Sequence, residues 1–119
     1  MKRILVVEDN EINMKLCREI IRYGGYEMIE ARDGNEAIEK AMKEMPNLIC
    51  MDIQLPGMDG VTAMKKMKEY PELKDIPVIA LTSYAMPGDK ERFLSEGFDD
   101  YISKPMKVQE VLETIKKYL

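Results

Sequence analysis

Acidic, hydroxyl and basic side chains follow four short apolar segments of this chain. The segments and the polar residues after them are 4–7 with Glu8 and Asp9, 48–51 with Asp52, 78–81 with Thr82 and Ser83, and 101–103 with Lys104. Short apolar segments that alternate with helical patterns are typical of buried strands in a parallel sheet. Because parallel strands all point the same way, we expect these side chains to gather along one edge of the sheet. Three carboxylates, a hydroxyl and an ammonium at that edge indicate a functional site.

The carboxylates of Glu8, Asp9 and Asp52 predict a cation site. Like charges that are crowded together are costly unless a cation lies among them. The chain has no histidine and the cluster offers only oxygen ligands, so the expected cation is a hard one, Mg²⁺. A carboxylate beside Mg²⁺ can attack phosphorus and form an aspartyl phosphate. Lys104 would then help to neutralise the charge of the transferred phosphoryl group, and the Thr82 hydroxyl could donate to one of its oxygens.

Each of these signals alone has an ordinary structural explanation. An acidic pair after a strand is most often a turn or a helix cap, Thr-Ser after a strand is commonly a turn, and Lys-Pro is commonly a surface pair. Four strand ends that offer mutually compatible groups are harder to attribute to caps and turns, and we therefore favour the site.

Five predicted strands alternate with five predicted helices. The strands are expected at about 3–7, 27–31, 48–51, 77–81 and 101–103, and the helices at about 11–23, 34–45, 60–69, 87–97 and 108–119. Pro87 is a favoured first helical residue, and Ile12, Leu16 and Ile20 place one apolar face on the first helix. The alternation predicts an α/β doubly wound sheet with helices on both faces. Such sheets bind ligands beyond the carboxyl ends of their strands, where the strand order reverses.

Length and charge limit the classes of protein to which the chain can belong. Its 119 residues predict a single domain that spans 1–119. A net charge of −4 and an isoelectric point near 5.0 argue against nucleic acid as a partner. The apolar segments are too short to span a membrane, and the first predicted strand leaves no room for a signal peptide. We therefore expect a cytoplasmic protein without a membrane partner.

The two cysteines, Cys17 and Cys50, are expected to be buried and reduced. They fall in a helical pattern and a strand pattern and lack the CxxC spacing of a metal or redox site. The absence of histidine excludes a histidine-dependent catalytic triad. It also means that any phosphoryl group must come from another protein or from a small phosphodonor.

Four motifs resemble those of the response-regulator receiver domain, the phosphoacceptor module of two-component signalling. They are VVEDN at 6–10, MDIQLPGMDG at 51–60, ALTSYAM at 80–86 and DYISKP at 100–105. The resemblance covers the whole chain and implies a flavodoxin-like (βα)5 fold with strand order 2-1-3-4-5. The segment from 81 to 105 resembles single-domain regulators of cell division and the receivers of hybrid histidine kinases more than it resembles winged-helix transcription factors.

The resemblance also implies how the site works. Asp52 would be the phosphoacceptor and Lys104 the lysine that binds the phosphoryl group. Mg²⁺ would be held by Asp9, Asp52 and the backbone carbonyl of Gln54, with Glu8 behind them or joined to the ion through water. The phosphoryl donor would be a sensor histidine kinase or a histidine phosphotransfer protein.

Further residues are implied to transmit and time the signal. Thr82 would be the switch hydroxyl and Tyr101 the switching aromatic side chain, acting on a face that the fourth helix, fifth strand and fifth helix present to an output protein. Ser83 is small and would leave the site open to the donor. Gln54 and Tyr84 follow Asp52 and Thr82 by two residues and are expected to set the lifetime of the phosphate.

The leading hypothesis is therefore a phosphorylation-dependent signalling switch in a phosphorelay. Such a protein is not an enzyme beyond supporting its own phosphoryl transfer and autodephosphorylation. One alternative is a Mg²⁺-dependent hydrolase with an aspartyl-phosphate intermediate, but such enzymes typically carry a second acid two residues after the nucleophile, where this chain has Gln54. Another is a flavodoxin-like electron carrier, which needs a Ser/Thr/Gly loop around the flavin phosphate after the first strand, but the Glu-Asp-Asn-Glu sequence at 8–11 would repel that phosphate.

The Lys104–Pro105 peptide bond is expected to be cis. The lysine must turn back from the end of its strand toward the carboxylates, and the cis form is accessible to bonds that precede proline.

Overall fold

Within residues 1–83 and 86–119, which the computed structural model describes, five parallel strands form one sheet in the order β2-β1-β3-β4-β5. The strands are β1 (Arg3–Val7), β2 (Glu27–Ala31), β3 (Leu48–Asp52), β4 (Val78–Thr82) and β5 (Asp100–Ser103). This confirms the predicted strand order and the edge position of β2. The order reverses between β1 and β3, so the carboxyl ends of these two strands border the predicted ligand site.

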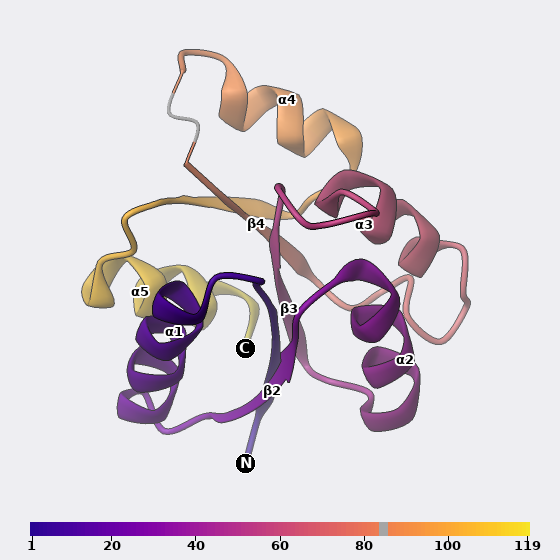
Figure 1. Cartoon of the computed structure of the whole chain (residues 1–119). Coiled ribbons are helices and arrows are strands. Elements are labelled where there is room, and N and C mark those ends of the chain that lie inside the picture. Colours follow the sequence, from indigo (N-terminus) through magenta and orange to yellow (C-terminus); the bar gives the residue numbers. More distant parts are fainter. Residues whose placement is uncertain (84–85) are drawn as a thin grey trace.

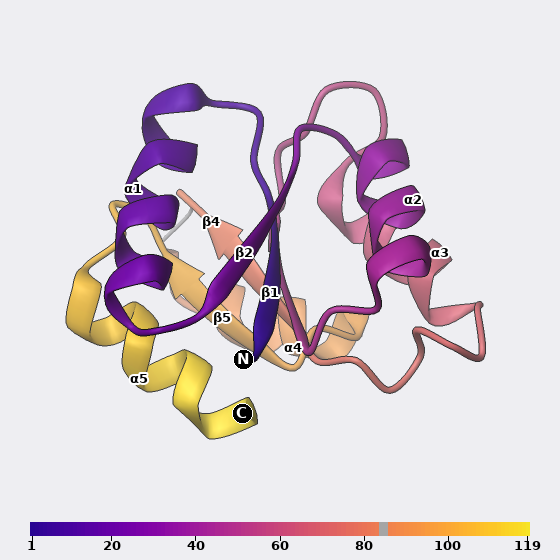
Figure 2. The same ribbon diagram turned by 90° about the horizontal axis from the view of Figure 1, so that it is seen from below.

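Helices cover both faces of the sheet in the described part of the chain. They are α1 (Glu11–Tyr23), α2 (Gly34–Glu44), α3 (Gly60–Lys68), α4 (Asp89–Glu96) and α5 (Val108–Tyr118). Helices α1 and α5 lie on one face, and α2, α3 and α4 lie on the other (Figure 1; Figure 2). The predicted doubly wound α/β fold is therefore confirmed. Among the described residues, no helix combines the length and the apolar character that crossing a membrane requires.

Two apolar layers, one on each face of the sheet, form the core. Successive strand residues point to opposite faces. In β1, Ile4 and Val6 pack toward α1 and α5, and Leu5 and Val7 pack toward α2, α3 and α4. All four side chains are fully buried. This two-sided burial explains why the central strands are continuously apolar, and it leaves their polar side chains to the strand ends.

Helix α4 begins later than the sequence predicts. Pro87 lies before the helix, and Gly88 is the N-cap with φ of 89°, in the left-handed region. That conformation suits glycine and cannot be part of a right-handed α-helix, so the helix begins only after Gly88. The Asp89 side chain accepts a hydrogen bond from the backbone N–H of Met86 at 3.1 Å, which closes the turn before the helix.

The buried face of α1 also differs from the predicted apolar face. Ile20 is buried as expected, but Leu16 is only half-buried and the Ile12 side chain is 79% exposed. The residues of α1 that are buried against the sheet and α5 are Met14, Cys17, Ile20 and Ile21. The core-facing row is therefore rotated around the helix from the row that starts at Ile12.

Both cysteines are free and buried, as predicted. The Cys17 thiol donates to the Met106 sulfur at 3.4 Å. Burial, with a smaller contribution from the Glu8 carboxylate, raises the pKa of Cys17 to about 12, and burial raises the pKa of Cys50 further. At pH 8 the Cys17 thiol is therefore almost entirely protonated, whereas the thiolate is the reactive form.

We therefore expect iodoacetamide to leave Cys17 and Cys50 unmodified in the folded protein. Intact-mass analysis at pH 8 should show two alkylations in denaturant and none without it after the same incubation. Rapid alkylation of either thiol without denaturant would contradict the burial described here.

Candidate functional site

The carboxyl ends of β1, β3 and β4 bring the predicted site residues to one edge of the sheet. Val7 pairs with Met51, so Glu8 and Asp52 are the next residues along two neighbouring strands. Asp52 pairs with Leu81, the residue before Thr82. Asp52 and Thr82 are the last residues of their strands and are buried, because each strand runs one residue beyond its predicted end.

Lys104 connects the acidic residues of two strands. Its Nζ lies 2.6 Å from Glu8 Oε1 and 3.0 Å from Asp52 Oδ2. The Lys104–Pro105 peptide bond is cis, as predicted. The backbone N–H of Lys104 donates to the Thr82 carbonyl at 2.7 Å, which fixes the lysine to the end of β4. The structure thus brings together Glu8, Asp52 and Lys104 from three distant parts of the sequence.

Burial and charge crowding shift the pKa values of two of these groups. The Glu8 side chain is fully buried, and this burial raises the pKa of Glu8 to about 7, with a further increase from its contact with the Asp52 carboxylate. Hydrogen bonds from Lys104 and from the Asn10 backbone N–H oppose the increase. Burial alone lowers the pKa of Lys104, but its hydrogen bonds to Glu8 and Asp52 outweigh burial and raise it. The ammonium is therefore retained between two acids.

The acidic cluster has the composition of a Mg²⁺ site. Ligand oxygens of Glu8, Asp9 and Asp52 all lie within 4.8 Å of one another, and Asp9 is exposed to solvent. The single ammonium of Lys104 does not balance the negative charge that three carboxylates can carry. Carboxylate oxygens with room for water are the surroundings that Mg²⁺ prefers. The residues present therefore fit the predicted metal.

Backbone groups fix the orientation of the acidic side chains. The backbone N–H of Gln54 donates to Asp52 Oδ1 at 2.9 Å. The backbone N–H of Asn10 donates to Glu8 Oε2 at 3.1 Å, and the Asn10 side chain accepts from the N–H of Asn13 to cap α1. The turn that leads into α1 therefore also orients Glu8.

The predicted switch residues lie on β4 and β5, which are neighbouring strands. Thr82 is buried at the end of β4, and Tyr101 is half-buried on β5. The Tyr101 ring stacks on Phe93 of α4, with ring centroids 6.0 Å apart and an angle of 21° between the planes. Ser83 is exposed, whereas Tyr84 lies outside the described residues. The expected effect of Tyr84 on phosphate lifetime therefore stays a prediction.

Residues 4–116 match the family model described as response regulator receiver domain. The chain is a response-regulator receiver domain. It is 51% identical over 118 residues to the polar-differentiation response regulator DivK of Brucella anthropi. The matched residues make up 99% of this chain and 96% of DivK. This similarity agrees with the predicted resemblance to single-domain regulators of cell division.

Solved structures of receivers share this fold. The receiver domain of sensor histidine kinase PA1611 from Pseudomonas aeruginosa, with magnesium coordinated in its active-site cleft, has a TM-score of 0.90 and 33% identity, covering 98% of this chain and 96% of that one. A chain in the complex of the Saccharomyces cerevisiae histidine phosphotransfer protein Ypd1 with the Ssk1 receiver has a TM-score of 0.89 and 27% identity, covering 98% and 88%.

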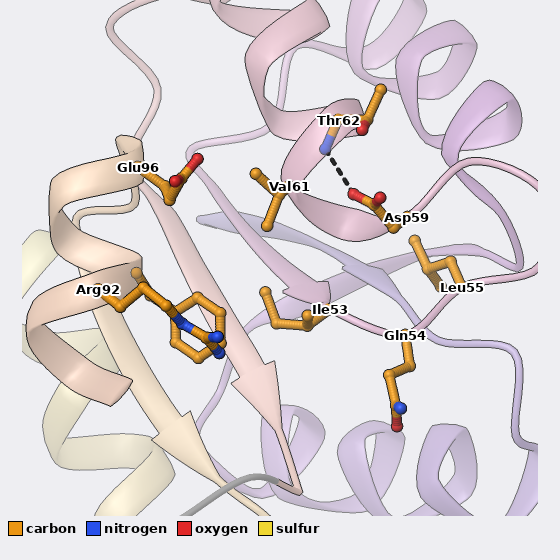
Figure 3. A pocket seen from close by; sticks show the side chains of 9 residues that line it. Ile53, Gln54, Leu55, Asp59, Val61, Thr62, Arg92 and Glu96 are labelled. Atoms are coloured by element: carbon orange, nitrogen blue, oxygen red, sulfur yellow. Dashed lines mark hydrogen bonds between the residues drawn. The ribbon is translucent and has the colours of Figure 1, made fainter. Parts of the chain in front are cut away.

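An open groove that the sequence did not indicate lies beside the loop that follows Asp52. It has a volume of about 570 Å³ and lies between the loop after β3, the start of α3 and α4 (Figure 3). Gln54 stands at one end of this groove, and Arg92 and Phe93 of α4 form another side. The Arg92 guanidinium lies 4.6 Å from the centre of the Phe93 ring. Gln54, predicted to affect phosphate lifetime, therefore borders solvent-accessible space two residues after Asp52 in the sequence.

Proposed function

We propose that this receiver is a phosphorylation-dependent switch in which Asp52 accepts a phosphoryl group from a phosphohistidine. The donor is a sensor histidine kinase or a histidine phosphotransfer protein, the class of partner present in the Ypd1 complex. The observation that carries the proposal is the contact of one ammonium, Lys104 Nζ, with both Glu8 and Asp52 at the edge of the sheet.

The groups around Asp52 suit an in-line phosphoryl transfer. A carboxylate oxygen of Asp52 attacks phosphorus, the bond from phosphorus to the imidazole nitrogen breaks, and that nitrogen keeps the electron pair. Lys104 neutralises negative charge on the transferred oxygens, and the Gln54 N–H holds Asp52 in place. Asp9, Asp52 and the Gln54 carbonyl would hold Mg²⁺, which when bound adds further charge neutralisation.

The phosphoryl group then alters contacts beyond the acceptor. Thr82 donates its hydroxyl to a phosphoryl oxygen, and Tyr101 rearranges with the α4–β5–α5 face, which binds an output protein. The stacking of Tyr101 on Phe93 supports this route because it joins β5 directly to α4. The protein acts as a switch whose only reactions are its own phosphorylation and autodephosphorylation.

The hydrolase alternative lacks a proton-transfer group at the expected position. Two residues after Asp52 the chain has Gln54, and an amide side chain cannot act as a general acid. An aspartyl phosphate should therefore persist on the protein.

Incubation with acetyl phosphate and Mg²⁺ tests this proposal. We expect intact-mass analysis in acid to show one added phosphoryl group per chain, which mild base removes. The control is the same incubation in acetate. Rapid consumption of acetyl phosphate without any phosphoprotein would instead support the hydrolase. If the protein neither becomes phosphorylated nor consumes acetyl phosphate, both functions are contradicted.

A further inference from the structure

The first residue of α3 lies unusually close to the backbone of the phosphoacceptor. A Cβ atom on Gly60 would lie 2.1 Å from the Asp52 carbonyl oxygen and 2.9 Å from Ile53 Cα. Both distances are far below a van der Waals contact, and both atoms belong to the backbone. A side chain at position 60 therefore requires the end of β3 and the start of α3 to move apart.

The residue between Asp52 and Gln54 is held from two sides. The Ile53 carbonyl accepts from the Gly60 N–H at 2.8 Å, and the Ile53 N–H donates to the Leu81 carbonyl of β4 at 3.0 Å. The start of α3 is itself fixed, because the Asp59 side chain accepts from the Thr62 N–H at 2.8 Å (Figure 3). A displacement at Gly60 therefore acts on Ile53 and on its two neighbours in the site.

A second glycine supports the same loop from α2. A Cβ atom on Gly34, the first residue of α2, would lie 3.0 Å from Met58 Sδ and 3.2 Å from Ala63 Cβ. The Met58 side chain thus occupies space that the glycine leaves open. These neighbours are side-chain atoms, which can shift more easily than the backbone beside Gly60.

We propose that Gly60, supported by Gly34, is a positioning residue for the phosphoacceptor site. Its missing side chain lets α3 approach the Asp52 carbonyl, which sets the direction of the Asp52 side chain and of the Gln54 backbone. The inference rests on the proposed function, since Asp52 and Gln54 are the groups proposed to meet phosphorus and Mg²⁺. The sequence indicates Gly60 only as the last residue of the motif at 51–60 and the start of a predicted helix.

Gly60→Ala tests the proposal against Gly97→Ala as a matched control. Gly97 has φ of 125° at the end of α4, so the same substitution strains the backbone there, against Met64 rather than against Asp52. Without metal or phosphate, Gly60→Ala should shift the amide resonances of residues 52–54. Its Mg²⁺ affinity, measured by NMR titration, should fall by about tenfold, as typically follows loss of a group that supports metal ligands.

The rate of labelling by acetyl phosphate should fall at least as much in Gly60→Ala, because small misplacements of reacting groups are costly. Gly97→Ala should be less stable to urea but retain the Mg²⁺ affinity of the wild type. Wild-type affinity and labelling in a folded Gly60→Ala protein would overturn the proposal, as would equal losses in both variants.

If Gly60→Ala does not fold, Gly34→Ala decides the question. It should lower Mg²⁺ affinity by a smaller factor and shift the resonances of residues 52–54, and an unchanged affinity would overturn the proposal. A failure of the proposed function would give a different result from a failure of this inference. The wild-type protein would then accept no phosphoryl group. The shifts of the amide resonances of residues 52–54 in metal-free Gly60→Ala would still test the positioning role of Gly60.

Discussion

Asp52→Asn is expected to abolish phosphorylation by acetyl phosphate, reducing the base-labile product to background. The amide of asparagine has nearly the shape of the carboxylate but lacks the anionic oxygen that attacks phosphorus. Asp52 is also one of the three acids whose ligand oxygens cluster within 4.8 Å. The substitution therefore removes the nucleophile and weakens the Mg²⁺ site together, and chelation of Mg²⁺ from the wild-type protein should likewise suppress labelling.

Asp59→Asn is the matched control for this variant. Asp59 is an exposed acid in the loop after β3, it caps α3, and asparagine caps helices about as well as aspartate. Its labelling should remain close to that of the wild type. Base-labile labelling that persists in Asp52→Asn at the wild-type rate would show that another carboxylate is the acceptor. A slow base-stable product would instead indicate transfer to a neighbouring hydroxyl and would leave the assignment intact.

The sequence predicted the strand ends well because both faces of this sheet are covered. Two-sided burial demands continuous apolar strands, so the first polar residues after the apolar parts of β1 and β3, Glu8 and Asp52, mark the carboxyl edge of the sheet. Because parallel strands end at the same edge of the sheet, the sequence also predicts that these residues lie close together, although it gives no distances. The structure adds the contacts themselves, above all the position of Lys104 Nζ between Glu8 and Asp52.

Other features depend on packing between elements, which periodicity does not encode. Ile12 follows the spacing of a core residue, yet it is 79% exposed because the sheet meets a different side of α1. The start of α4 is set by the left-handed conformation of Gly88, which one sequence cannot distinguish from an ordinary turn. The need for glycine at position 60 arises from contact with backbone eight residues earlier, and no local pattern reveals it.

Beryllofluoride with Mg²⁺, a mimic of the phosphoryl group, is expected to shift amide resonances across α4, β5 and α5. A phosphoryl group adds about −1.5 to −2 charges and strong acceptor oxygens beside the end of β4, where Thr82 offers a hydroxyl. Movement of that hydroxyl toward the acceptor vacates space beside β4, and Tyr101 on β5 lies next to it. Because the Tyr101 ring stacks on Phe93, its movement breaks a contact with α4 and requires that helix to repack.

Thr82→Ala should largely remove these distant shifts while Asp52 can still be phosphorylated. The methyl side chain of alanine cannot donate a hydrogen bond to the phosphoryl group, so the route to Tyr101 is lost while the acids and Lys104 remain. Thr114→Ala is the matched control, since Thr114 is a second buried threonine whose hydroxyl donates to the Glu110 carbonyl within α5. It should retain the shifts in α4 and β5. NMR is the suitable probe because the chain has no tryptophan. Shifts confined to the loops around Asp52 in the wild type, or full distant shifts in Thr82→Ala, would show that the signal does not pass through Thr82 to this face.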